Sequence, residues 1–284
     1  MKKFILFTLL ILSNLSQLYS QELNVKVSGK GPKIIFIPGL ASSGEVWDQA
    51  VTQLSKNYEC HVITLPGFGT NPPTEIQDGF FKTMEGLISD YIVTQNEQVT
   101  LIGHSLGGFI SLKLSRSHPK QIKRTIIVDS YPFYSAALNP SATEESMAGM
   151  ATQAKEMMIS QSEEQYQTQQ KMTMAMMTTS SEKIPILVDW SMQSDRATIA
   201  QAFYELMTSD FRDELADVNT PILVLGAWAS GKDYGMTEES VKQAFSNQYK
   251  LAKNVQIRMA PTAYHFIMWD NPDWFLENVT EFLK

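Results

Sequence analysis

One serine, Ser105, lies in a stretch whose residue types and spacing could support covalent chemistry. The stretch reads LIGHSLGGFISLKL, and Gly103 and Gly107 stand two positions before and after the serine. An apolar run typical of a strand precedes it, and apolar residues at helical spacing follow. At a tight strand-to-helix turn, flanking glycines relieve crowding, and the side chain is presented above the sheet edge. This context favours a nucleophilic serine over an incidental serine in a glycine-rich loop.

Other glycine-rich motifs fit this stretch less well. A phosphate-binding loop requires Gly-Lys-Ser or Gly-Lys-Thr, which does not follow here, and the glycine spacing differs from a dinucleotide-binding fingerprint. The amino end of the following helix favours the negative charge that develops when a nucleophile attacks a carbonyl. The motif therefore predicts attack on a carbonyl carbon by Ser105.

A serine hydroxyl needs a base to accept its proton, and histidine is the usual base near neutral pH. The chain has four histidines. His104 adjoins the serine, so the turn should direct its ring elsewhere, while His61 begins a predicted strand and His118 ends a predicted helix. His265, in APTAYHFIMWDNPDWF, follows the last predicted strand, where a loop opens on the same sheet edge as Ser105. We expect His265 to be the base.

The elements that must position these residues alternate along the chain. From about residue 22, short apolar runs alternate with amphipathic segments, which predicts an α/β fold with a mainly parallel sheet covered by helices on both faces. Helical spacing recurs over Trp47–Leu54, Phe80–Tyr91 and Trp274–Phe282. The predicted strands are Asn24–Val27, Lys33–Ile37, Cys60–Leu65, Val99–Ile102, Arg124–Val128, Ile222–Leu225 and Val255–Met259.

Residues 132–210 interrupt this alternation. They contain no convincing strand but several helical patterns, and they hold 10 of the 15 methionines. No low-complexity linker separates them from the rest, so we expect a helical lid inserted into one core of residues 21–131 and 211–284. Methionines suit an apolar surface without a fixed shape. We therefore expect a small-molecule substrate with an apolar acyl group.

Composition excludes several classes of function. Lys and Arg total 23 against 30 Asp and Glu, a net charge of −7 without a basic cluster, so nucleic acid is not an expected partner. Cys60 is the only cysteine, which excludes an intrachain disulfide, and we expect it in the core. No two histidines share a short spacing, so neither a catalytic metal nor another cofactor is implied.

The first 20 residues have the pattern of a signal peptide. Lys2 and Lys3 precede an apolar run over Phe4–Leu12, and a more polar stretch follows up to Ser20. An uncleaved anchor is the alternative, but the run is shorter than the ~20 residues that span a bilayer. We expect an exported protein, periplasmic or secreted, whose mature chain begins near Gln21 and has no stable membrane span.

Residues 24–284 resemble the α/β-hydrolase superfamily, in particular its small exported serine hydrolases with a helical lid. The matching pieces are IIFIPGLASSGEVW, VITLPGFGTNPP, LIGHSLGG, TIIVDSYP, PILVLGAW and YHFIMWDNPDWF. The resemblance implies a Ser105 nucleophile, a His265 base and an oxyanion hole formed by the backbone N–H groups of Leu40 and Leu106. Many members have His-Gly where this chain has Pro-Gly before Leu40, which leaves this second donor open.

The resemblance also implies an acidic residue that orients the histidine. Members usually carry it just after the strand that corresponds to PILVLG, but here AWASGKDYG delays the first carboxylate to Asp233. Asp129, at the end of the strand before the insertion, is the alternative, because some relatives place the acid there. A turn or a helix cap would explain either aspartate without catalysis. We expect Asp233 to be the acid.

These residues predict a serine hydrolase that cleaves a carboxylic ester through an acyl-enzyme. The same triad could cleave an amide, a thioester or an activated C–C bond, because all pass through the same kind of tetrahedral oxyanion. A non-catalytic ligand-binding protein of this fold is the remaining alternative, and it would have no use for all three types of triad residue.

Overall fold

The computed structural model describes residues 23–284. The predicted signal peptide, residues 1–20, and the cleavage point near Gln21 lie outside this range. Within residues 23–284, no helix combines the length and apolar character needed to cross a membrane.

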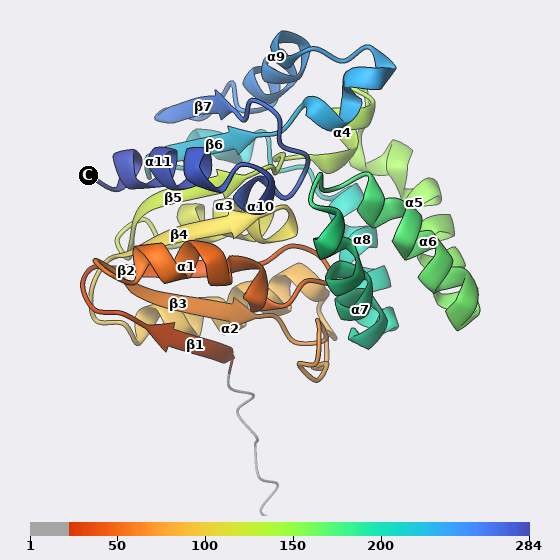
Figure 1. The fold of residues 1–284 in the computed structure, drawn as a ribbon, viewed down its shortest axis with the longest axis horizontal. Helices are drawn as coiled ribbons and strands as arrows, with labels where there is room; N and C mark the ends of the chain where they lie inside the picture. Colours follow the sequence, from red (N-terminus) through yellow and green to blue (C-terminus); the bar gives the residue numbers. More distant parts are fainter. Residues whose placement is uncertain (1–22) are drawn as a thin grey trace, which may run out of the picture.

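A sheet of seven strands forms the centre of the molecule (Figure 1). Its order is β1-β3-β2-β4-β5-β6-β7; β1 runs antiparallel to β3, and every other neighbouring pair is parallel. This confirms the predicted α/β class with a mainly parallel sheet. The strands are β1 (Asn24–Ser28), β2 (Lys33–Ile37), β3 (Glu59–Thr64), β4 (Val99–His104), β5 (Ile122–Val128), β6 (Ile222–Gly226) and β7 (Val255–Met259).

Burial on both faces explains why the strands are continuous apolar runs. Along β2, Ile35 and Ile37 belong to one buried cluster, whereas Ile34 and Phe36 belong to another on the opposite face. This alternation follows from the two-residue period of a strand. Cys60 is buried in the second cluster.

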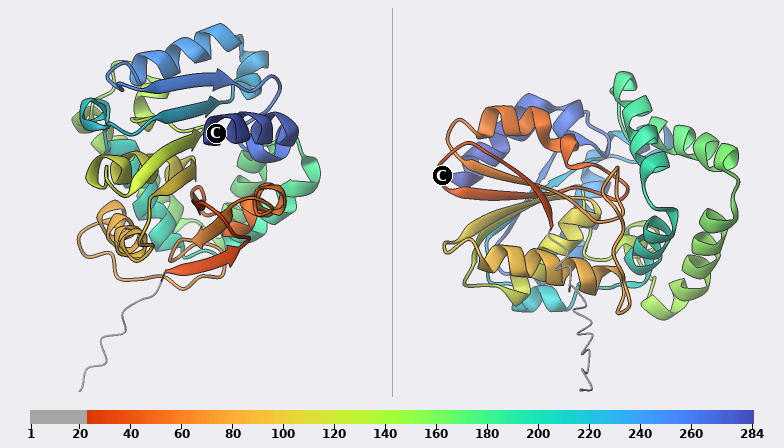
Figure 2. Two further views of the ribbon diagram at one scale, coloured as in Figure 1. Left: turned by 90° about the vertical axis from the view of Figure 1, so that its left-hand side faces the viewer. Right: turned by 90° about the horizontal axis from the view of Figure 1, so that it is seen from below.

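Helices cover both faces. The first cluster includes residues of α2, α3 and α9, and the second includes residues of α1, α10 and α11. The end-on view separates the two layers, with the helices on either side of the strands (Figure 2). These helices are α1 (Asp48–Leu54), α2 (Phe80–Val93), α3 (Leu106–Ser117), α9 (Glu238–Gln248), α10 (Ile267–Asp270) and α11 (Pro272–Leu283).

Five further α-helices follow β5 and precede β6 along the chain. In both figures α5 to α8 stand together beyond one edge of the sheet, where the arrows of β3 and β4 end (Figures 1 and 2). This is the edge on which the carboxyl ends of the parallel strands meet. The helices are α4 (Tyr134–Leu138), α5 (Glu144–Ser160), α6 (Glu163–Ala175), α7 (Ile184–Gln193) and α8 (Arg196–Thr208).

The methionines of this inserted segment do not share one surface. Met147, Met174 and Met207 are buried, whereas Met172 and Met176, one turn apart near the end of α6, are exposed. Only some of the methionines in residues 132–210 therefore face the core.

Glycines allow α3 to lie unusually close to the strands beneath it. A Cβ at Gly103 would stand 2.3 Å from the Gly107 carbonyl oxygen, and a Cβ at Gly107 would stand 2.3 Å from the Ile37 carbonyl oxygen. Both are backbone atoms, so no side-chain rotation could relieve the overlap. The two glycines flanking Ser105 are thus required by the packing of α3 against β4 and β2.

We predict that Gly107→Ala lowers the free energy of unfolding by about 1–3 kcal/mol or more, because the new methyl group forces α3 away from β2. Gly86→Ala is the control: Gly86 is exposed within α2, and a Cβ there meets nothing within 4 Å. It should stabilise the protein by roughly 0.5–1 kcal/mol through helix propensity. Urea denaturation measures both, and equal effects at the two positions would contradict the prediction.

Candidate active site

Ser105 occupies the turn between β4 and α3 with a strained backbone. Its φ of 52° and ψ of −121° lie outside the regions that residues with a Cβ favour. Hydrogen bonds over-determine this conformation: Ser105 N–H donates to the Val128 carbonyl at 2.9 Å, and the Ser105 carbonyl accepts from the N–H groups of Gly108 and Phe109. The strain is held at the position where the sequence places the nucleophile.

Two other loops at this edge carry the same kind of strain. The described residues contain four non-glycine positions with positive φ, and three of them are Ala41, Ser105 and Asp129, in the loops after β2, β4 and β5. Asp129 N–H donates to the Leu225 carbonyl at 2.8 Å, much as Ser105 N–H continues the ladder from β4. Each ladder thus runs one residue beyond its strand before the chain turns sharply.

The two predicted oxyanion donors lie at this edge. Leu40 follows β2 and stands next to the strained Ala41, while Leu106 is the first residue of α3. Neither N–H donates to an acceptor within residues 23–284. Gly39 packs close to the Ser105 turn, because a Cβ there would lie 3.3 Å from the Ser105 Cβ. The loop after β2 and the start of α3 therefore converge beside Ser105.

The His265 ring is paired with Asp129. His265 Nδ1 lies 2.6 Å from Asp129 Oδ2, and Asp129 Oδ1 accepts from the Ala227 N–H at 2.8 Å. The carboxylate thereby connects the loops after β5, β6 and β7. Both carboxylate oxygens have donors, and the side chain is only 14% exposed, which fixes the orientation of the imidazole.

Asp233, the expected acid, lies elsewhere. It belongs to η4 (Ala229–Tyr234), a 3₁₀ helix after β6, and is exposed. No hydrogen bond or ion pair joins it to His265 in the described part of the chain. Of the two candidate acids, the structure places Asp129, the alternative, and not Asp233 against the ring. The physical reason is strand adjacency: β5 and β6 are neighbours, so the end of β5 delivers a carboxylate to the place where a loop after β6 would otherwise be needed.

His104 is a further residue of the site, whose contribution the sequence does not reveal. Its ring is 1% exposed, lies 4.5 Å from the His265 ring between centroids, and also contacts Phe266 and Trp47. His104 Nε2 lies 3.0 Å from the His265 carbonyl oxygen, so Nε2–H donates to this carbonyl. Its buried Nδ1 has no partner within the described residues.

Burial is the main reason why the pKa of His104 is well below its usual range, and the neighbouring His265 lowers it further. The hydrogen bond to the His265 carbonyl acts in the opposite direction but is outweighed. His104 therefore supports the backbone of His265 as a neutral ring.

Ser105 directly follows His104 in the chain, and the His104 ring packs on the His265 ring, so Ser105 and His265 are close to each other. Ser105 Oγ itself forms no hydrogen bond with another residue in the described range. Such bonds commonly tighten only in the complex with substrate. With Nδ1 directed to Asp129, the other ring nitrogen, Nε2, is the one available to receive the serine proton.

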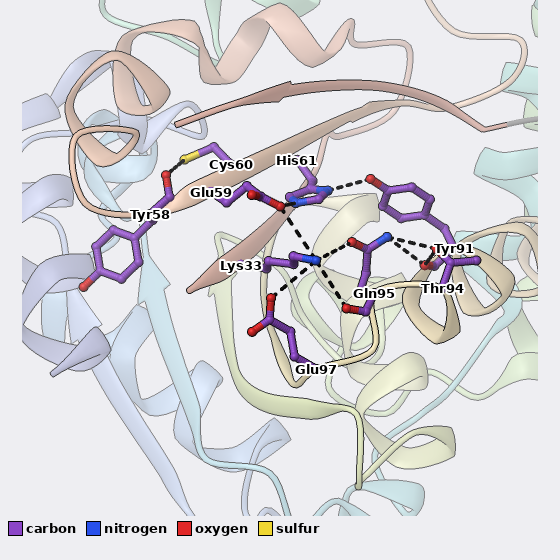
Figure 3. A network of polar contacts seen from close by, with 9 residues as sticks. All are labelled: Lys33, Tyr58, Glu59, Cys60, His61, Tyr91, Thr94, Gln95 and Glu97. Atoms are coloured by element: carbon purple, nitrogen blue, oxygen red, sulfur yellow. Dashed lines mark hydrogen bonds and ion pairs between the residues drawn. The ribbon is translucent and has the colours of Figure 1, made fainter. Parts of the chain in front are cut away.

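The remaining two histidines are accounted for away from this edge. His61, in β3, has Nδ1 2.5 Å from the Tyr91 hydroxyl and Nε2 2.9 Å from Glu59 Oε1, in a polar network that also contains Lys33 (Figure 3). Lys33 and Glu59 begin their strands, so the network lies at the opposite edge of the sheet. His118 follows α3 and shares a hydrogen bond with Ser117.

The loop that carries Asp129 is supported by α9, a helix that the sequence analysis did not identify. Tyr249, directly after α9, is buried and donates its hydroxyl to the Ser130 carbonyl at 2.8 Å. Gln248 Oε1 accepts from the Phe133 N–H at 3.1 Å. Desolvation raises the pKa of Tyr249 well above its usual value, so its hydroxyl remains a donor.

The fold, the serine motif and the geometry describe an α/β protein with a candidate active site at a strand-to-helix turn that carries a serine. Comparison with known families supports this class. The chain belongs to the alpha/beta hydrolase family, whose model matches residues 34–278.

Individual relatives are distant. A pimeloyl-[acyl-carrier protein] methyl ester esterase from Pseudoalteromonas atlantica is 24% identical over 259 residues, 91% of this chain and 97% of that protein. One of the same name from Vibrio atlanticus is 29% identical, but over 43% of this chain and 45% of that protein, so the chain spans under half of its length. An esterase structure from Exiguobacterium antarcticum has a TM-score of 0.74 and 17% identity, covering 92% of this chain and 94% of that one, which shows a shared fold.

The neutral state of His104 leads to a prediction about stability and pH. In the unfolded chain this histidine binds a proton below its ordinary pKa of about 6.5, whereas in the folded protein it stays neutral. Its contribution to stability is therefore present above about pH 6.5 and is lost as the pH falls, by at most about 1.4 kcal/mol per pH unit.

We expect His104→Gln, which keeps a donor for the His265 carbonyl but cannot titrate, to lose less stability on acidification than the wild type. Urea denaturation between about pH 7.5 and 5.5 measures the difference. Because the other titrating groups are common to both proteins, parallel pH profiles would show that His104 does not remain neutral in the fold.

Proposed function

We propose that this protein is a serine hydrolase that cleaves a small carboxylic ester through an acyl-enzyme, with Ser105 as nucleophile, His265 as base and Asp129 as acid. The observation that carries the proposal is the Asp129–His265 hydrogen bond of 2.6 Å, at the edge where Ser105 occupies its strained turn. The names of the relatives and of the matching structure, which are esterases, support the ester class.

In the first step, Ser105 Oγ attacks the ester carbonyl carbon while His265 Nε2 takes the hydroxyl proton. Asp129 keeps Nδ1 protonated, so that Nε2 is free to accept, and it stabilises the imidazolium that forms. The oxyanion can accept hydrogen bonds from the N–H groups of Leu40 and Leu106, which have no acceptor within residues 23–284.

The tetrahedral intermediate then collapses. The bond to the alkoxy oxygen breaks, the imidazolium protonates the departing alcohol, and an ester to Ser105 remains. Water attacks this acyl-enzyme in the same way, with His265 as base, and releases the acid and the free serine. No cofactor takes part in these steps.

For the acyl part of the substrate we keep the expectation of an apolar group. The support for this expectation comes from two methionines: the side chains of Met174 and Met177 belong to the same apolar cluster as Phe266, which directly follows His265. Met172 and Met176 are exposed and give no support to an apolar acyl site.

We predict that Ser105→Ala folds but loses nearly all hydrolysis of p-nitrophenyl esters, since the nucleophile is removed and Oγ has no structural hydrogen bond. Labelling with a fluorophosphonate probe should disappear as well, while thermal melting stays close to wild type. Across the acetate to octanoate series, wild-type kcat/KM should rise, by up to about 0.8 kcal/mol of binding per buried CH₂. Undiminished turnover by the variant would exclude the mechanism, and a flat series would exclude the apolar acyl site.

The two aspartates provide a second prediction. Asp129→Asn should lower kcat by about 10²-fold or more, because an amide neither fixes the tautomer nor stabilises the imidazolium. Asp233→Asn, at an exposed position without contact to His265, should leave kcat/KM within about two-fold.

Thermal melting must accompany both assays, since an unfolded variant is also inactive. A folded Asp129→Asn variant with normal turnover, alongside an inactive Asp233→Asn variant, would show that the catalytic acid is Asp233, in the segment after β6.

A further inference from the structure

One carboxylate near the site, that of Asp270, accepts several hydrogen bonds but has no role in the triad. Asp270 ends α10, five residues after His265. Its Oδ1 accepts from the Thr178 hydroxyl at 2.6 Å, the Thr179 N–H at 3.1 Å and the Ser180 hydroxyl at 3.3 Å. Its Oδ2 accepts from the Thr179 N–H at 3.1 Å and the Tyr264 N–H at 2.9 Å.

These donors come from two separate parts of the chain. Thr178, Thr179 and Ser180 form the connection between α6 and α7 in the inserted segment, whereas Tyr264 directly precedes His265. All the donors are neutral, and no salt bridge of Asp270 is present within residues 23–284. A charged acceptor with neutral donors makes stronger hydrogen bonds than a neutral acceptor does.

The backbone around His265 is fixed by three such contacts in succession. Tyr264 N–H donates to Asp270, the His265 carbonyl accepts from His104, and Phe266 N–H donates to the Met177 carbonyl. The Phe266 bond connects the histidine loop directly to the end of α6, and the Tyr264 bond connects it indirectly, through the Asp270 carboxylate. Asp270 is thus one of the links between the helical segment and the loop of the base, together with the contacts of Trp269 with Trp190 and Lys183.

On the basis of the proposed hydrolase function, we propose that Asp270 is a positioning residue. It joins the helical segment between β5 and β6 to the His265 loop. The imidazole is correctly oriented toward Asp129 and Ser105 only while this segment and this loop are connected. The side chain does not touch the reacting atoms; it acts through the Tyr264 N–H and the backbone that follows.

Asp270→Asn tests this with little change in shape. An amide replaces one acceptor oxygen by an NH₂ group, which then faces an N–H or O–H donor, and the negative charge is lost. We expect kcat to fall by about 10- to 100-fold, the loss typical of a base displaced by about 1 Å, with a smaller change in KM. Asp273→Asn, an exposed aspartate in the first turn of α11, is the matched control and should behave as wild type.

A readout that does not need catalysis separates positioning from activity. The proton on His265 Nδ1, in its 2.6 Å contact with Asp129, should give a far-downfield proton resonance in the wild type and in Asp273→Asn. In Asp270→Asn this resonance should shift or broaden. If the wild type neither hydrolyses esters nor reacts with a fluorophosphonate, the hydrolase function fails, yet the resonance still decides whether Asp270 positions the ring.

Should Asp270→Asn fail to fold, two neighbouring threonines decide the question. Thr178 is buried and donates its hydroxyl, whereas the Thr179 side chain is exposed and only its backbone donates. Thr178→Val should therefore lower kcat and shift the resonance, and Thr179→Val should do neither. A folded Asp270→Asn or Thr178→Val variant with wild-type kcat and an unchanged resonance would overturn the proposal, as would an activity loss that merely matches the fraction unfolded.

Discussion

The hydrogen bond between Asp129 and His265 sets the geometry of the whole carboxyl edge. Its two partners are 136 residues apart in the chain and come from the loops after β5 and β7, on either side of β6. Strand order decides whether such a contact can form: with β5, β6 and β7 side by side, the Ala227 N–H between them holds the second carboxylate oxygen. The pairing of three strands is thus a condition for orienting one imidazole.

Close packing supplies the other half of the arrangement. Ser105 stands in its turn because Gly103 and Gly107 let α3 approach the backbone of β4 and β2, at distances that a Cβ would prevent. Above the turn, the neutral ring of His104 fills the space between Gly39 and the His265 carbonyl. Local strain at Ser105 and Asp129 is tolerated since hydrogen bonds that continue the strand ladders hold each turn.

Much of this was predictable from the sequence, for physical reasons. Seven strands were recognisable because a sheet buried on both faces requires apolar runs, and the location of Ser105 and His265 at one sheet edge was recognisable because their loops adjoin such runs. The carboxylate that contacts His265 was not, because the choice between Asp129 and Asp233 depends on which strands are neighbours, and no local pattern carries that information. Asp270 and α9 were missed for a similar reason, since their contacts link distant segments and the α9 sequence is largely polar.

The helical segment between β5 and β6 begins and ends at residues that meet, because the Phe211 N–H donates to the Pro132 carbonyl at 3.0 Å. The segment therefore leaves the core and returns to it at nearly the same place. For such a closed excursion, doubling the length costs only about 0.6 kcal/mol of closure entropy. Helices could be gained, lost or exchanged in this segment during evolution with little effect on the sheet, provided that an equivalent of the Thr178–Asp270 contact persists. Substrate range and the hydrolytic apparatus can then diverge at independent rates.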